Sequence, residues 1–259
     1  MELKSNKKTF SYSDWLTKLK SMVDAKQINL LTMADLKDCD KISKNIPNVV
    51  IRHDLDMQTG NIFKVNYDID TARKLLNILY AEKALGLVST TYIQRYFVIP
   101  DNDFSNQFVF ALKNFESDGF EIGYHINDMC EAELQLKGNP INDIIMCGEI
   151  LYHDHITELQ KVFNIRTASA HGYGKRYVEP NNLTIEHQLK HDDEVSGFKN
   201  IVISLINKGI SVAYHTDSFM FTDYNTTFDP ITMLDNLKAN VCGTVCIFLF
   251  HPQLYDITS

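Results

Sequence analysis

Apolar and polar positions along this chain follow two spacings that alternate from about residue 49 onward. Short runs rich in apolar and β-branched residues, which suit strands, lie between longer segments whose apolar residues recur at helical spacing. Several helical segments end at a glycine, as at Gly86, Gly119 and Gly209. Strands that alternate with helices in this way build βαβ units, so the pattern predicts an α/β fold with a parallel sheet.

The predicted elements can be placed by residue number. The strands are expected at about Val49–Asp56, Val88–Phe97, Phe120–His125, Arg166–His171, Ile210–Thr216 and Thr244–Phe250. The helices between them are expected near Ile69–Leu85, Asn106–Ser117, Cys130–Leu136, Ile141–Phe163, Lys199–Asn207 and Pro230–Lys238. No internal repeat or low-complexity linker interrupts the series, and residues 47–259 are therefore predicted to form one domain.

The first 46 residues are expected to be a short helical attachment that packs on this domain. Ser11–Ala25 is predicted to be an amphipathic helix, with Ser13 as its N-cap. Residues 28–45 read as a second, weaker helical or irregular segment that ends near Pro47. The attachment supplies none of the candidate site residues.

Charged residues gather where the first strand of the main domain ends. The stretch Val49–Asp56 reads VVIRHDLD, in which three apolar residues lead into an arginine, a histidine and two aspartates. Because side chains alternate along a strand, Arg52, Asp54 and Asp56 lie on one face, and His53 lies on the other. Two carboxylates on one face are costly to bury without a partner, and a metal ion would be one.

The same kind of ending recurs along the chain. Five of the nine histidines lie at predicted strand tips, namely His53, His125, His171, His215 and His251. Parallel-barrel enzymes place their sites at the C-terminal tips of strands, where the loops converge on one mouth. We therefore expect a shared site, with Arg52 orienting Asp54 or Glu121 inside the barrel. The other histidines are expected to be solvated: His153, His155, His187 and His191.

Composition and charge narrow the function classes. Hydrophobic residues make up 44% of the 259 positions and charged residues 22%, which is ordinary for a soluble globular protein. The net charge of −8 argues against a nucleic-acid partner. No apolar run is long enough to cross a bilayer, and the basic start Lys4–Lys8 lacks the apolar segment of a secretory signal. A cytoplasmic protein with free cysteines is the expectation.

Five short motifs, in order, resemble those of the polysaccharide deacetylase superfamily, carbohydrate esterase family 4. They are RHDLD (Arg52–Asp56), EIGYH (Glu121–His125), SAHGYG (Ser169–Gly174), DS (Asp217-Ser218) and FHP (Phe250–Pro252). The resemblance covers about Val49 to Pro252 and is nearest to a divergent intracellular branch with RHDVD and EIGYH signatures. It implies an incomplete (β/α)7 barrel, a small-molecule or glycan substrate and a divalent metal ion, with zinc expected.

The resemblance also implies roles for individual residues. In family members the first aspartate of an Asp-x-Asp motif acts as general base and the second binds metal, which points to Asp54 and Asp56. The histidine after the third strand is a metal ligand, here His125, and the histidine after the last strand is a general acid, here His251. Arg52 is expected to assist catalysis. His171 is predicted as a further metal ligand, and the predicted substrate-binding residues are Tyr173, His215 and Asp217.

Two positions depart from the family pattern. Where the family has a second histidine, four residues after the first, this chain has Met129, a poor zinc ligand. The open alternatives are that the sphere is completed by Asp128, His171, His53 or His251, or that no metal binds tightly. The usual Arg-Pro-Pro-Tyr-Gly segment reads Ala-His-Gly-Tyr-Gly here, which leaves the steadying of the base to Arg52 or His171.

Three functions follow as hypotheses. The first is a metal-dependent hydrolase that removes an acyl group from an N-acylated sugar or surface-polysaccharide precursor. The second is a hydrolase of non-sugar C–N bonds, such as those of a cyclic amide. The third is a catalytically inactive barrel that binds a glycan or a partner protein, for which Met129 is the main support. The oligomeric state does not follow from the sequence.

Overall fold

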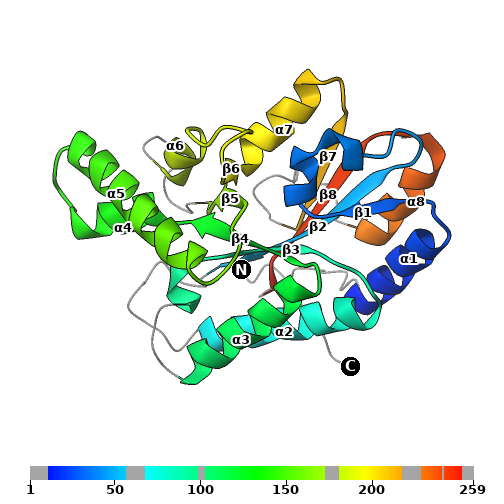
Figure 1. The fold of residues 1–259 in the computed structure, drawn as a ribbon, viewed down its shortest axis with the longest axis horizontal. Helices are drawn as coiled ribbons and strands as arrows, with labels where there is room; N and C mark the ends of the chain where they lie inside the picture. The colour runs from blue at the N-terminus through cyan, green and yellow to red at the C-terminus, as the bar shows by residue number, and fades with distance from the viewer. Residues whose placement is uncertain are drawn as a thin grey trace, which may run out of the picture.

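Parallel strands form a curled half-barrel with helices around its outside (Figure 1). The structure is a computed structural model and describes residues 11–56, 68–98, 103–172, 181–217, 229–240 and 242–252. Along the sheet the strand order is β6-β5-β4-β3-β2-β8-β7, and β1 pairs with β2 outside this path. The strands are β1 Asn29–Leu31, β2 Asn48–Leu55, β3 Thr90–Ile93, β4 Glu121–Ile126, β5 Thr167–Ala170, β6 Ser196–Gly197, β7 Val212–Thr216 and β8 Val245–Phe250.

Every strand pairing in the sheet is parallel, as the alternation of strand-like and helical segments predicted. The helices are α1 Tyr12–Asp24, α2 Asp68–Ala84, α3 Asp103–Ser117, α4 Asp128–Gln135, α5 Ile141–Gln160, α6 Asn182–Glu186, α7 Phe198–Asn207 and α8 Pro230–Asn240. Short 3₁₀ turns cover η1 Ala34–Lys37, η2 Cys39–Lys41 and η4 Arg95–Phe97. The predicted α/β class is confirmed, and the fold is consistent with an incomplete (β/α)7 barrel.

Apolar side chains cover the outer face of the sheet and bind the helices to it. Ile93, Ile122 and Tyr124 on β3 and β4 pack in one cluster with α2, α3 and α5. On the other half, Trp15 of α1 packs with Phe248 and Phe250 of β8. A strand buried by helices on its outer face needs apolar residues there, which explains the near-continuous apolar runs of the sequence.

The barrel interior is apolar toward the N-terminal ends of the strands. Met33 and Leu36, which lie before and within η1, pack there with Val50, Tyr92 and Ile247. Two backbone N–H groups of the same segment are satisfied by strand side chains: Met33 N donates to Thr90 Oγ1, and Ala34 N to Glu121 Oε2. The N-terminal segment thus closes one end of the barrel and leaves the site to the other end.

The N-terminal segment differs in detail from its prediction. Residues 28–45, expected to be weakly helical or irregular, contain strand β1 as well as two 3₁₀ turns. The expected N-cap Ser13 is wrong, because the Ser11 side chain accepts the hydrogen bond from Asp14 N and the helix begins at Tyr12. Since β1 joins the main sheet through β2, the predicted boundary at residue 46 has hydrogen bonds across it.

Within the described ranges, none of the helices combines the length and the apolar character that a membrane crossing requires.

Candidate metal centre at the barrel mouth

Strand β2 delivers its charged side chains to opposite faces, as the alternation predicted. Arg52 and Asp54 lie inside the barrel, and both are almost fully buried. His53 points outward, where its Nε2 lies 2.8 Å from Glu82 Oε1 and neither side chain is exposed. Because His53 faces the helices, it cannot complete a ligand set at the mouth.

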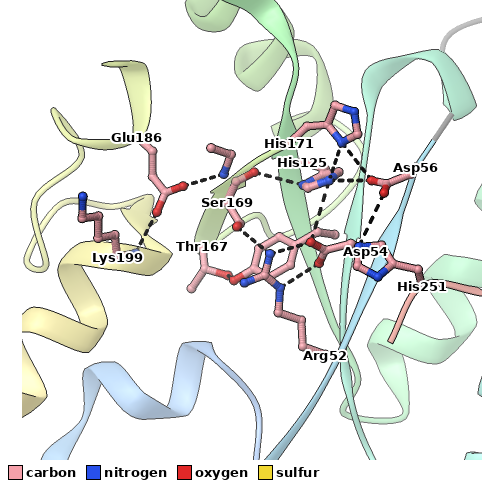
Figure 2. A network of polar contacts seen from close by, with 12 residues as sticks. Arg52, Asp54, Asp56, His125, Thr167, Ser169, His171, Glu186, Lys199 and His251 are labelled. Atoms are coloured by element: carbon pink, nitrogen blue, oxygen red, sulfur yellow. Dashed lines mark hydrogen bonds and ion pairs between the residues drawn. The ribbon is translucent and has the colours of Figure 1, made fainter. Parts of the chain in front are cut away.

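Asp56, His125 and His171 converge at the mouth from three different strands (Figure 2). Asp56 Oδ1 lies 2.9 Å from His125 Nε2 and 2.9 Å from His171 Nδ1. The two imidazole nitrogens are 3.2 Å apart. The predicted approach of Asp56 to His125 is therefore present, and His171 joins them from the end of β5.

A hydrogen bond on the far side of His125 fixes which of its nitrogens faces this triangle. His125 Nδ1 lies 3.1 Å from the backbone oxygen of Ser169, which can only accept, so the proton of the neutral ring is on Nδ1. The lone pair on Nε2 is then directed at the space shared with Asp56 and His171. Histidine ligands of metal ions are oriented by backbone or carboxylate acceptors in the same way.

The spacing of these atoms fits a metal ion. Three ligands held about 2.0–2.1 Å from a tetrahedral ion lie about 3.3 Å from one another, and the observed separations are close to that. Two imidazole nitrogens and one carboxylate oxygen are also a common donor set for divalent transition metals. Asp56, His125 and His171 could therefore hold a metal ion.

The electrostatics of the triangle favour ionised Asp56. Burial alone would raise the pKa of Asp56, but the charge of His171 and hydrogen bonds from both histidines lower it well below its usual range. For His171, burial alone would lower the pKa, but the Asp56 carboxylate raises it. A metal ligand must present a lone pair, so an ionised Asp56 is ready to bind one.

His251 approaches the triangle from β8 and is held by Asp217. Its Nε2 lies 3.5 Å from Asp56 Oδ2, and its Nδ1 lies 2.5 Å from Asp217 Oδ1. Asp217 Oδ2 also accepts from the backbone N–H of His251. Burial alone would lower the pKa of His251, but the hydrogen bond and charge of Asp217 raise it to about 9. Asp217, predicted to bind substrate, is thus engaged in orienting His251.

Arg52 binds Asp54 with both ends of its planar group. Arg52 Nε and one terminal nitrogen lie 2.7 and 2.6 Å from the two carboxylate oxygens. The same terminal nitrogen donates to Ser169 Oγ. The guanidinium carbon is 4.7 Å from the Tyr92 ring centre and 4.5 Å from that of Phe198. Burial would raise the pKa of Asp54, but Arg52 outweighs it and the pKa is lowered.

Gly123 of the EIGYH motif makes room for this arrangement. A Cβ at residue 123 would lie 2.5 Å from the Tyr92 ring and 3.0 Å from the backbone oxygen of Thr167. A side chain there would displace the ring on which Arg52 stacks. The glycine in the motif is therefore explained by close packing inside the barrel.

The second candidate partner of Arg52 lies deeper in the barrel. Glu121 accepts hydrogen bonds from Ala34 N, Thr90 Oγ1 and Thr167 Oγ1, and burial raises its pKa. Of the two alternatives left by the sequence, Arg52 therefore pairs with Asp54, and Glu121 anchors the N-terminal segment.

Several predicted residues lie away from the site. His215 stacks on Phe248, 5.0 Å between ring centres, on the outer face where Phe248 packs with Trp15. The prediction that His215 contacts substrate is contradicted by this placement, because the residue sits on the opposite face of β7 from the lumen. Tyr173, the third predicted substrate-binding residue, lies outside the described residues.

The remaining candidates for the ligand set also point outward. Met129 is buried against Gly148 of α5, with its sulfur 3.0 Å from where a Cβ would lie. Asp128 accepts from Tyr124 Oη and lies 2.5 Å from His155 Nδ1. His155, expected to be solvated, is instead 4% exposed, because it joins this buried pair.

Sequence reasoning missed three residues that hold the site together. Ser169 contacts Arg52 through its hydroxyl and His125 through its carbonyl oxygen. Asn182 and Glu186, both in α6, bind the backbone at the end of β5. For Ser169 a signal existed, since it shares a strand face with His171, but for the two residues of this five-residue helix the sequence carried none.

Comparisons with known proteins identify no relative: no family model, no curated protein and no solved structure matches this chain.

Proposed function

We propose that this chain is a metal-dependent hydrolase of the polysaccharide deacetylase type, which removes an acyl group from an N-acylated sugar. The observation that carries the proposal is the metal-ligand spacing of Asp56, His125 and His171, with Asp54 and His251 beside them. These residues come from four strand ends and belong to the motifs that resemble the family. Zinc is the metal we propose, because it accepts mixed imidazole and carboxylate ligands and keeps a position open.

The chemistry that a bound divalent ion supplies is Lewis acidity, which activates water and polarises an acyl oxygen. Asp54 is suited to accept the proton of the attacking water, because its low pKa keeps it ionised and Arg52 fixes its orientation. His125 Nε2 is 3.8 Å from Asp54 Oδ2, so the base lies next to the ligand set.

His251 is suited to the opposite proton transfer. Asp217 holds its Nδ1, which leaves Nε2 facing Asp56 and the centre of the mouth. A protonated imidazole there can donate to the leaving nitrogen as the C–N bond breaks. Water thereby supplies a hydroxyl to the acyl carbon and a proton to the amine, so that the products are a carboxylic acid and a free amino sugar.

The experiment that tests this proposal measures metal content and turnover together. Metal-depleted protein is reloaded with zinc, cobalt, nickel or manganese, and acid release is followed from N-acetylated oligosaccharides, nucleotide-linked sugars and small cyclic amides. We expect one metal ion per chain and turnover of an acylated sugar. Asp54→Asn should lower kcat by at least about 100-fold and keep the metal. Replacement of the exposed His153 by Asn is the matched control and should change neither.

Three outcomes would contradict the proposal in different ways. Absence of stoichiometric metal after reloading would remove its basis. Turnover of cyclic amides alone would favour a hydrolase of non-sugar C–N bonds. Tight metal binding with no turnover in the parent, and glycan binding unchanged in Asp54→Asn, would favour an inactive binding barrel.

A further inference from the structure

Helix α6 presents two buried polar side chains to the end of strand β5. Asn182 and Glu186 are 1% and 2% exposed. They are four positions apart, so they lie on the same face of the helix. Polar groups this deeply buried need partners, and the partners of both are backbone groups around the metal-binding triangle.

Glu186 takes the place of a missing strand. On the edge of β5 away from β4, pairing with β6 ends at Ala168, which leaves the next backbone N–H on that edge, at Ala170, without a strand partner. Glu186 Oε2 accepts from this Ala170 N at 2.5 Å (Figure 2). Its other oxygen accepts from Lys199 N, 2.7 Å away, in the first turn of α7, where the helix dipole favours a negative charge.

Asn182 binds the neighbouring backbone group and the adjacent strand end. Its Nδ2 donates to the carbonyl oxygen of His171 at 3.1 Å, and its Oδ1 accepts from Met129 N at 3.1 Å. His171 N donates in turn to Ile126 O at the end of β4. The amide before His171 and its own carbonyl are therefore both held by side chains of α6.

We propose that α6 is the positioning element for His171, through Glu186 and Asn182, and that the ligand triangle keeps its geometry only while both contacts are made. The inference rests on the proposed metal-binding function. His171 lies at the last paired position of a short strand, beyond which no ladder fixes its backbone, and its ring is 20% exposed. Without the two contacts, its Nδ1 would be free to leave Asp56.

Gly197 supports the same reading from the other side. A Cβ at residue 197 would lie 2.7 Å from the backbone oxygen of Glu186 and 3.1 Å from its Cγ. The close approach of β6 to α6, which sets the position of the carboxylate, therefore requires glycine. Outer contacts of this kind typically change metal affinity by 10–100-fold when they are removed.

The test combines a metal-dependent and a metal-independent readout. Glu186→Gln keeps the shape but places an amide N–H where a carboxylate oxygen accepted. We expect about 10–100-fold weaker cobalt binding by calorimetry, an altered visible cobalt spectrum, and a weaker nuclear Overhauser contact between the His125 and His171 rings in metal-free protein. Glu116→Gln is the matched control, because Glu116 also accepts from a backbone N–H, that of Asn164, in another part of the chain.

Asn182→Asp provides an independent variant should Glu186→Gln not fold. It keeps the acceptor for Met129 N and turns the donor to the His171 carbonyl into a repelling oxygen, so it should weaken the same ring contact. If the parent bound no metal, the proposed function would fail, and the ring contact alone would still decide the role of α6. The inference is overturned if the variants that fold keep both the ring contact and any cobalt affinity of the parent within twofold.

Discussion

Arg52 shows how a single side chain can carry charge into the barrel at an acceptable cost. Its guanidinium is nearly fully buried, yet it is paired with Asp54 at two atoms, donates to Ser169 and is stacked between two aromatic rings. A buried pair of this kind adds little net stability, but removal of one partner leaves an uncompensated charge. Arg52 is therefore needed for Asp54 to remain ionised indoors.

Replacement of Arg52 by Met should destabilise the protein by about 3–5 kcal/mol, because Asp54 would be buried without its cation. The double variant with Asp54→Asn should regain a large part of this loss. The measurement is urea unfolding at neutral pH. Arg73→Met is the matched control, since its pair with Asp70 is exposed, and its expected cost is below about 1 kcal/mol. Equal losses for the two arginine variants would contradict this account.

At the residue scale, the sequence predicted faces better than partners. Alternation along β2 placed Arg52 and Asp54 inside and His53 outside, as found. The same rule failed for His215 because nothing in β7 says which face is turned to the lumen; its apolar residues occupy both. His155 could not be predicted as buried either, since its partner Asp128 lies 27 positions earlier on another helix.

Among the secondary-structure elements, α1 shows how local capping and distant packing share the work. Its apolar stripe docks on β8 through Trp15, and Tyr12 Oη donates to Glu82 Oε1 of α2. The helix begins at Tyr12 rather than after Ser13, because that register lets Tyr12 reach the buried carboxylate while Ser11 caps the end. Local sequence alone offered two serines of similar capping propensity, and tertiary packing chose between them.

Removal of the cap gives a prediction for this helix. Ser11→Ala should lower the free energy of unfolding by about 1 kcal/mol, because the hydrogen bond to Asp14 N is lost. Ser13→Ala should be within about 0.5 kcal/mol of the parent, since Ser13 is an exposed position inside the helix. Chemical denaturation of the two variants beside the parent decides it, and a larger loss for Ser13→Ala would show that the cap lies at the other serine.

Long elements were predictable and short ones were not. The helices α2, α3, α5 and α7 begin and end within a few residues of their predicted limits, because each has many apolar positions at helical spacing. Strand β6 has two residues and helix α6 has five, which is too few for any spacing to register. The parts of the site that depend on α6 were therefore invisible from sequence, although the histidine it positions was not.

Taken as a whole, the molecule divides the barrel interior along its axis. The segment around η1 fills one end with apolar side chains, Glu121 and Arg52 lie in the middle with fully engaged hydrogen bonds, and Asp56, His125 and His171 meet at the mouth. Close approach of an acceptor and two imidazoles is stabilised when an ion binds among them. Metal binding should therefore stabilise the entire domain, since the ligands come from β2, β4 and β5.

Zinc at about 100 times its dissociation constant should stabilise the native state by about 2.7 kcal/mol, provided that the unfolded chain does not bind it. For a chain of this size, that corresponds to a rise in Tm of about 5–10 °C. His171→Ala should lose most of this shift at the same zinc concentration, because one of three ligands is gone. His153→Ala removes an exposed histidine of α5 and should keep it. Calorimetric scans with and without zinc measure the shift, and equal shifts in both variants would mean that zinc binds elsewhere, which would contradict the assignment of the three strand-end residues.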